Sequence, residues 1–197
     1  MILILKAELT VGKQLIKGEK IDINKINGHS NKFVIDITCK SDNENTFDID
    51  AFICVCETNN RISKKGIIFY NNPESTEKSI WFEDGCADNI EKKKEFDIDL
   101  NSVPANISKL IIGYSIYKSK NNLDKQMLVN IKLRLINSIM QEEVFSMDIQ
   151  SDIIVNNVGV IGEIYKYKEF WKFNAIEYNS TSDLISTIKI LYNIEVY

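Results

Sequence analysis

The stretch Phe47-Asp48-Ile49-Asp50-Ala51 alternates apolar and acidic residues, and an apolar run from Phe52 to Cys56 follows it directly. This alternation is typical of a β-strand with one buried face. We therefore expect its apolar residues to face a core. Asp48 and Asp50 should then lie together on the opposite face, with their Cα atoms roughly 6.5 Å apart.

The acidic pair on this strand has two interpretations. Two carboxylates that close repel each other unless a cation or a hydrogen-bond donor lies between them. Calcium prefers several carboxylate and carbonyl oxygens at about 2.3–2.6 Å, so Asp48 and Asp50 are candidates for the nucleus of a cation site. A solvated sheet face is the simpler interpretation of these two residues alone.

Length and charge limit the class of protein. The chain has 197 residues, 44% of them hydrophobic and 26% charged, which indicates one globular domain spanning residues 1–197. It carries 24 basic and 28 acidic residues, and the net charge of −4 argues against a general nucleic-acid binder. Apart from Lys92-Lys93-Lys94, the basic residues are scattered, and that run is typical of a solvated loop.

The start of the chain and the cysteines predict a cytoplasmic protein. Met1–Leu5 is apolar but lacks a basic segment before it, and Lys6 ends it too early for a secretion signal. No stretch reaches the roughly 18 apolar residues that a membrane span requires. The four cysteines fit reduced, buried thiols: Cys39, Cys54, Cys56 and Cys86.

The fold class follows from the spacing of short β-patterned runs. About ten such runs are separated by short turns, which favours an antiparallel β-sandwich of two sheets. Residues 129–135 form the clearest amphipathic strand. Residues 158–165 and 171–176 resemble a hairpin that turns at Lys168-Glu169.

A short C-terminal helix completes this all-β fold. Only residues 182–192 have helical spacing of apolar side chains. Ser182 is a suitable N-cap, and Asp183 suits the first turn. On the strand before the helix, Trp171 and Phe173 alternate and are expected to be buried in the core.

Several runs, in order, resemble the TerD family of tellurium-resistance and chemical-stress proteins. Residues 15–23 are similar to the family's opening L-x-K-G-x-x-(I/V)-x-L, and residues 47–51 to its F-D-L-D-A strand. Residues 68–72 resemble F-x-F-Y-N-N. Residues 162–165 and 169–175 resemble G-E-(L/I)-Y-R and W-K-F-x-A. The resemblance covers about residues 15–196.

The resemblance implies a β-sandwich of two sheets, a non-enzymatic role and calcium bound by acidic loops at one edge. It implies a binding or scaffold module whose partners are other proteins of a stress-response or tellurium-resistance system. Asp48 and Asp50 match the family motif. The family's G-D-N matches either Asp84 or Asp88, so these four aspartates are the candidate metal ligands.

Lysines stand at several positions where the family carries acids. They are Lys40, Lys64 and the run 92–94. An ammonium group within about 4–6 Å of the site would repel a metal and pair with the carboxylates. We therefore expect a degenerate calcium site, closed by ion pairs that involve Lys40, Lys64 or Lys93, and weak or absent calcium binding.

Two other classes of function stay as alternatives. The single histidine, His29, lies in a turn without a patterned partner, which argues against a histidine-dependent catalyst. A hydrolase built on a carboxylate pair is the enzymatic alternative. Since the TerD family is also associated with cyclic nucleotides, a small-ligand-binding protein is the other. Arg61 and Arg134 are the only arginines, which disfavours a phosphate pocket.

Overall fold

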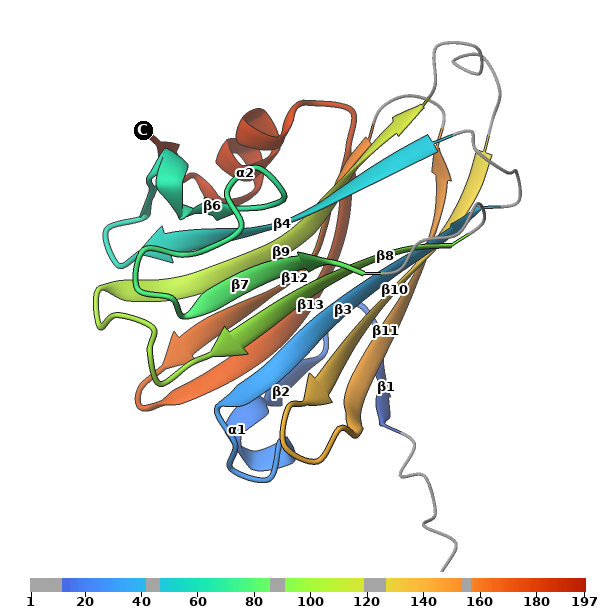
Figure 1. Ribbon diagram of the computed structural model, residues 1–197. Helices are drawn as coiled ribbons and strands as arrows, with labels where there is room; N and C mark the ends of the chain where they lie inside the picture. The colour runs from blue at the N-terminus through green and yellow to red at the C-terminus, as the bar shows by residue number, and fades with distance from the viewer. Residues whose placement is uncertain (1–11, 42–46, 86–90, 119–126, 154–156) are drawn as a thin grey trace, which may run out of the picture.

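The computed structural model describes residues 12–41, 47–85, 91–118, 127–153 and 157–197. Two six-stranded sheets lie face to face (Figure 1). Sheet A has the strand order β1 (Lys13–Leu15), β11 (Glu143–Ile153), β10 (Met127–Asn137), β3 (Lys32–Ser41), β8 (Glu91–Asp99), β7 (Ile80–Asp84). Sheet B has the order β2 (Lys20–Asp22), β13 (Phe170–Ser180), β12 (Asn157–Tyr167), β9 (Ile107–Lys118), β4 (Phe47–Glu57), β6 (Ile67–Ile68).

The sandwich is antiparallel, as predicted, with two parallel additions. Within the two sheets every described strand pair is antiparallel except β1 with β11. A further parallel pair joins β5 (Arg61–Ile62) to β14 (Glu195–Val196). The helices are short: α1 (Ile23–Ile26), the 3-10 turn η1 (Lys64–Gly66) and α2 (Leu184–Tyr192).

The main core fills the space between the sheets and follows the expected two-residue period. On β4, Ile49, Ala51 and Ile53 belong to this core. On β10, Val129, Ile131, Leu133 and Leu135 belong to it, while the residues between them face outward. Because side chains on a strand alternate between its faces, each sheet contributes every second residue to the core.

A second apolar cluster lies on the outer face of sheet B. Phe52, Cys54 and Cys56 of β4 are buried there, against Ile188 of α2 and Ile194. Residues 52–56 are therefore buried or half-buried on both faces of the strand. This explains why the alternation of β4 gives way to a continuous apolar run at Phe52.

A glycine on β9 makes room for this second cluster. Gly113 pairs with Phe52 across the β4–β9 ladder. A Cβ atom at Gly113 would lie 2.5 Å from the Cζ atom of the Phe52 ring. Because real Cβ contacts are never that short, the ring can cover β9 only where the side chain is absent.

The cap of α2 differs from the prediction by one residue. Asp183, not Ser182, is the N-cap, and its carboxylate accepts a hydrogen bond from the Ser186 amide at 2.9 Å. The helix ends at Asn193, whose φ of 52° places it in the left-handed region. An aspartate N-cap also carries negative charge at the positive end of the helix, which suits it better than serine.

Other expectations about the core are confirmed. Strands β12 and β13 form the predicted hairpin, and Lys168 in its turn has a φ of 56°. Trp171 and Phe173 are buried in the main core. Cys39, Cys54 and Cys56 are free and buried, and burial raises the pKa of the thiols of Cys39 and Cys54. Cys86 lies outside the described residues.

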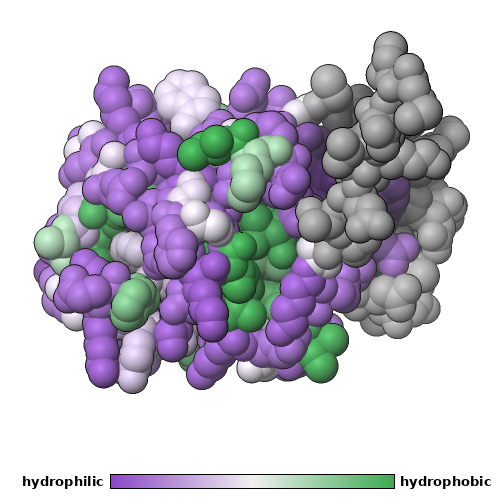
Figure 2. All heavy atoms as spheres, turned by 90° about the horizontal axis from the view of Figure 1, so that it is seen from below, coloured by the Kyte–Doolittle hydropathy of each residue, from purple (hydrophilic) through white to green (hydrophobic). Residues whose placement is uncertain are grey.

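The end of the sandwich that carries α1 is held by two buried asparagines. Asn137 donates from Nδ2 to the Oδ1 of Asn27 at 2.8 Å, and its own Oδ1 accepts from the amides of Ile139 and Met140. These bonds fix the β10–β11 turn with the side chains of Ile139 and Met140 exposed. Figure 2 views this end and shows apolar side chains among hydrophilic ones.

No helix among the described residues is long and apolar enough to span a membrane.

Candidate functional site: a groove beside Asp50

The acidic pair of β4 lies on the outer face of sheet B, as the alternation predicts. Asp48 is exposed and Asp50 is half-buried, and across the ladder they pair with Tyr117 and Ser115 of β9. The carboxylate of Asp48 accepts a hydrogen bond from the Ile49 amide at 2.9 Å. Burial, and then the charge of Asp48, raise the pKa of Asp50.

Asp84, the third candidate ligand, is paired with a lysine. It lies at the end of β7, where its Oδ1 is 2.5 Å from the Nζ of Lys94 on β8. The same ammonium group partly opposes the rise in the pKa of Asp50, and the charge of Asp84 adds to that rise. Asp84 therefore belongs to the electrostatic surroundings of Asp50. Asp88 lies outside the described residues.

Lys94, which pairs with Asp84 and acts on Asp50, is not one of the lysines predicted to form ion pairs here. Lys40 and Lys93 form ion pairs on the outer face of sheet A instead, so their expected role beside the acidic pair is wrong. Lys64 does line the same groove as Asp50. The lysine of the 92–94 run that acts on Asp50 is Lys94, because β8 directs it to the other side of the sheet from Lys93.

Within the described residues, the acidic side chains near Asp50 do not gather into a cluster of metal ligands. Among them, no three His, Cys, Asp or Glu side chains lie close enough together to hold a metal ion. Asp48 and Asp50 supply two carboxylates, and Asp84 is already bound by an ammonium group. Calcium takes six to eight oxygen ligands, and a neighbouring cation opposes its binding.

A groove of about 500 Å³ opens beside Asp50. Four segments form it: the first half of β4, the stretch from η1 to the turn after β6, the end of β9 and the start of α2. Its walls are mostly apolar or aromatic, formed by Phe52, Ile67, Phe69, Tyr70, Tyr117, Leu184 and Ile185. Its polar side chains are Asp50, Lys64, Ser115 and Asp183.

The turn after β6 is built to present two aromatic rings. Asn72 donates from Nδ2 to the carbonyl oxygens of Lys65 at 3.0 Å and Ile67 at 2.8 Å, which closes the turn. The rings of Phe69 and Tyr70 meet edge to face, with centroids 5.3 Å apart. The F-Y-N-N motif thus forms one wall of the groove.

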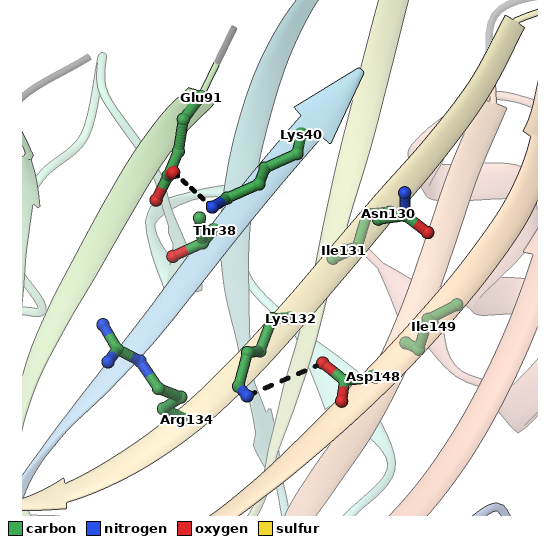
Figure 3. A pocket seen from close by; sticks show the side chains of 9 residues that line it. All are labelled: Thr38, Lys40, Glu91, Asn130, Ile131, Lys132, Arg134, Asp148 and Ile149. Atoms are coloured by element: carbon green, nitrogen blue, oxygen red, sulfur yellow. Dashed lines mark ion pairs between the residues drawn. The ribbon is translucent and has the colours of Figure 1, made fainter. Parts of the chain in front are cut away.

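A second hollow, of about 820 Å³, lies on the outer face of sheet A (Figure 3). Lys40, Lys132 and Arg134 line it, and each is paired. Glu91 lies 2.7 Å from Lys40, and Asp148 lies 3.9 Å from Lys132, as the dashed lines in Figure 3 show. Three cations therefore face three anions, the third anion being the partner of Arg134. This balance does not favour a phosphate ligand.

The partner of Arg134 is Asp36, a buried aspartate that the sequence did not reveal. Its carboxylate is fully buried and lies 2.7 Å from Nη2 of Arg134 and 3.2 Å from Nζ of Lys93. Thr38 donates a further hydrogen bond at 3.0 Å. Hydrogen bonds to Glu95 and Asp36 raise the pKa of Lys93. These contacts satisfy Asp36 within the sheet and hold three strands together.

A buried ion pair beneath α2 was also missed. Glu163 of the G-E-I-Y run lies 2.9 Å from Lys109 and accepts a hydrogen bond from Asn174 at 3.0 Å. The ammonium of Lys109 lies 4.5 Å from the ring centroid of Tyr192, the last residue of α2. This part of the motif therefore connects sheet B to its helix, and a polar residue within an apolar strand run was its only sequence signal.

Comparison with known proteins agrees with this architecture. The TerD domain family matches residues 11–189. General stress protein 16U of Bacillus subtilis is 28% identical over 172 residues, covering 82% of this chain and 88% of the relative. Tellurium resistance protein TerD of Serratia marcescens is 24% identical over 170 residues, covering 82% and 88%.

Solved structures share the fold. The crystal structure of SAV2460, a protein of unknown function, superposes with a TM-score of 0.58 at 12% identity, covering 82% of this chain and 98% of the other. A homologue of telluride resistance protein (TerD) from Streptomyces coelicolor gives 0.50 at 12% identity, covering 79% and 95%. Because the family match spans most of the chain and the sandwich is shared, this protein belongs to the TerD family.

Proposed function

We propose that the protein is a non-catalytic binding module of a cytoplasmic stress-response system of the tellurium-resistance type. The observation that carries the stress role is the TerD domain match across residues 11–189. The relatives include a general stress protein, tellurium resistance proteins and a chemical-damaging agent resistance protein. The buried free thiols fit a reducing compartment.

A binding role suits the chemistry of the groove better than catalysis does. Its walls are apolar and aromatic, and its polar groups are one half-buried carboxylate, a helix-capping carboxylate, a serine and an exposed lysine. The histidine lies in the turn after α1, and the groove lies at the α2 end of the molecule (Figure 1). Such a surface is suited to holding part of another molecule.

Calcium is not part of this proposal. Lys94 pairs with Asp84 and partly opposes the rise in the pKa of Asp50, so a metal ion bound at Asp84 would meet a positive charge. We expect any affinity for calcium to be millimolar or weaker.

A genetic complementation experiment tests the stress role. The gene is deleted in its host, and survival is measured in tellurite and in a chemical-damaging agent, with and without a plasmid copy. We expect the deletion to lower survival and the wild-type copy to restore it. Equal survival of the deletion strain and its parent under both stresses would contradict the proposal.

A further inference from the structure

Resting on this binding role, we propose that the groove beside Asp50 receives a basic side chain of a partner protein, a lysine or arginine flanked by apolar residues. Three features of the groove favour such a ligand: its negative charge, its aromatic walls and the half-buried carboxylate of Asp50.

The groove carries an excess of negative charge, and one of its carboxylates receives no hydrogen bond from the described residues. Asp50 and Asp183 line it, and Lys64 is its one lining ammonium group. Asp48 lies two residues before Asp50 on the same strand face, and the nearby pair of Lys94 and Asp84 has no net charge, so negative charge is in excess. Asp183 is engaged as the cap of α2. Asp50 is half-buried, and none of the described groups donates a hydrogen bond to it.

A cation entering the groove would relieve an unfavourable arrangement. Withdrawing a carboxylate from water costs free energy unless a donor or an opposite charge compensates it. Asp50 is also repelled by Asp48, and burial together with that repulsion raises its pKa. An ammonium or guanidinium group beside Asp50 would supply both the hydrogen bonds and the opposite charge.

The walls select an organic cation over a metal ion. The exposed rings of Tyr70 and Tyr117 offer faces on which a cation can rest, and Ile67 and Leu184 offer apolar contact to its hydrocarbon stem. The chain makes a contact of this kind elsewhere, where the guanidinium of Arg61 lies 4.1 Å from the Tyr197 ring centroid. A hard metal ion gains nothing from aromatic or apolar walls.

Lys64 does not block this site. It is exposed on η1, and among the described residues its ammonium group forms no ion pair with Asp50 or Asp183. Its backbone amide bonds to the carbonyl oxygen of Tyr197, which fixes the backbone and leaves the side chain able to move aside.

The test uses a charged peptide and its neutral analogue. Acetyl-Leu-Arg-Leu-amide is titrated into the full-length protein, and amide resonances of the groove are followed by NMR. Acetyl-Leu-citrulline-Leu-amide has nearly the same shape without the charge. We expect the arginine peptide to shift the resonances of Tyr117 and Leu184, and to bind at least fivefold more tightly than the citrulline peptide.

Variants localise the effect. Asp50→Asn is expected to abolish the preference for arginine, whereas Asp148→Asn, which removes the same charge from sheet A, should keep it. Tyr117→Leu preserves an apolar wall but removes the ring, and should weaken arginine binding. It provides an independent test if Asp50→Asn fails to fold.

Four results would overturn the proposal. The first two are equal binding of the two peptides and no change in the amide resonances with either peptide. The third is a change in the groove resonances with calcium chloride but not with peptide. The fourth is a change that depends only on protein concentration, which would indicate that a second copy of the chain occupies the groove. The complementation experiment separates this failure from failure of the stress role. If wild type restores survival but the peptides do not bind, only the groove proposal fails.

Discussion

The outer faces of the two sheets are stabilised in different ways. On sheet B, α2 and the C-terminal segment cover a second apolar cluster that contains Phe52, Cys54 and Cys56. On sheet A no helix among the described residues covers the face, and charged side chains pair across the strands around buried Asp36. One face is closed by apolar packing and the other by ion pairs.

The groove lies where the apolar cover of sheet B ends. Along β4, Phe52 is buried beneath the cover, and two residues earlier Asp50 is only half-buried. The start of α2 and the turn after β6 form the rim at this point. In the part of the chain that the structure describes, sheet A has no comparable rim, and the cations of its hollow already have partners. The covered face therefore provides the better candidate for binding a partner.

The largest effect is expected from removing the apolar cover. Phe52 is 2% exposed, so Phe52→Ala should lower the free energy of unfolding by about 3–5 kcal/mol. Trp171→Ala in the main core should cost a similar amount. Lys132→Ala on the outer face of sheet A is the control, with an expected loss of roughly 0.5 kcal/mol or less. Urea denaturation measures all three, and an unchanged midpoint for Phe52→Ala would show that the second cluster does not stabilise the fold.

The sequence predicts strands well because their period is local. The alternation in residues 47–51, the pattern of residues 129–135 and the hairpin around Lys168 are visible within a few residues, and the structure confirms them. The N-cap of α2 was missed by one position, since Ser182 and Asp183 are both good capping residues.

The outer faces could not be predicted in the same way. Asp36 stands between two isoleucines, which is the pattern of an ordinary outward residue. Its burial depends on Arg134 and Lys93, which strand pairing brings from distant parts of the chain. The groove has the same origin, because four separate segments form it. Asp50 and Lys64 were recognisable from the sequence as neighbours, and the aromatic residues that form the groove walls beside them were not.

The next largest effect tests the ion network of sheet A. Asp36→Asn leaves Arg134 and Lys93 without their shared anion and should cost about 2 kcal/mol. Fully buried pairs cost roughly 3–5 kcal/mol to break, but these two side chains are 35% and 30% exposed and can regain water. Asp148→Asn, an exposed pair, should cost about 0.5 kcal/mol or less. Equal midpoints for the two variants would show that burial of Asp36 adds nothing.

Replacing Asp50 is expected to have a smaller effect on the free energy of unfolding, and to stabilise the protein rather than destabilise it. Its pKa is raised in the folded protein, so the folded state holds this proton more tightly than the unfolded chain does. Stability should therefore fall as the pH rises from about 3.8 through the folded pKa, and stay lower at neutral pH. Asp50→Asn removes that penalty and should be more stable than wild type at pH 7, by less than about 1 kcal/mol because the group is partly solvated. Below pH 3 the difference should vanish.

Asp183 is the matched control, because its pKa is shifted in the opposite direction to that of Asp50. Hydrogen bonds from Ser186 lower its pKa, so its contribution to stability is present at neutral pH and is lost on acidification. Asp183→Ala should therefore destabilise the protein at pH 7 and show little difference at pH 2. Thermal melts across this pH range check both variants. If Asp50→Asn were less stable than wild type at pH 7, the carboxylate would have a favourable partner in the folded state.

The smallest effect is expected from adding calcium. The change in melting temperature shows whether Lys94 prevents a metal ion from binding to the aspartates near Asp50. A ligand at 100 times its dissociation constant stabilises by about 2.7 kcal/mol, which is several degrees in a domain of this size. Because Lys94 holds Asp84 at 2.5 Å, millimolar calcium should raise the melting temperature of the wild type by about 1 °C or less. Lys94→Gln frees Asp84 and should increase the response, whereas Lys92→Gln, two residues earlier on β8, should not. A clear shift in the wild type that disappears in Asp48→Asn/Asp50→Asn would show instead that the acidic pair binds calcium despite the lysine.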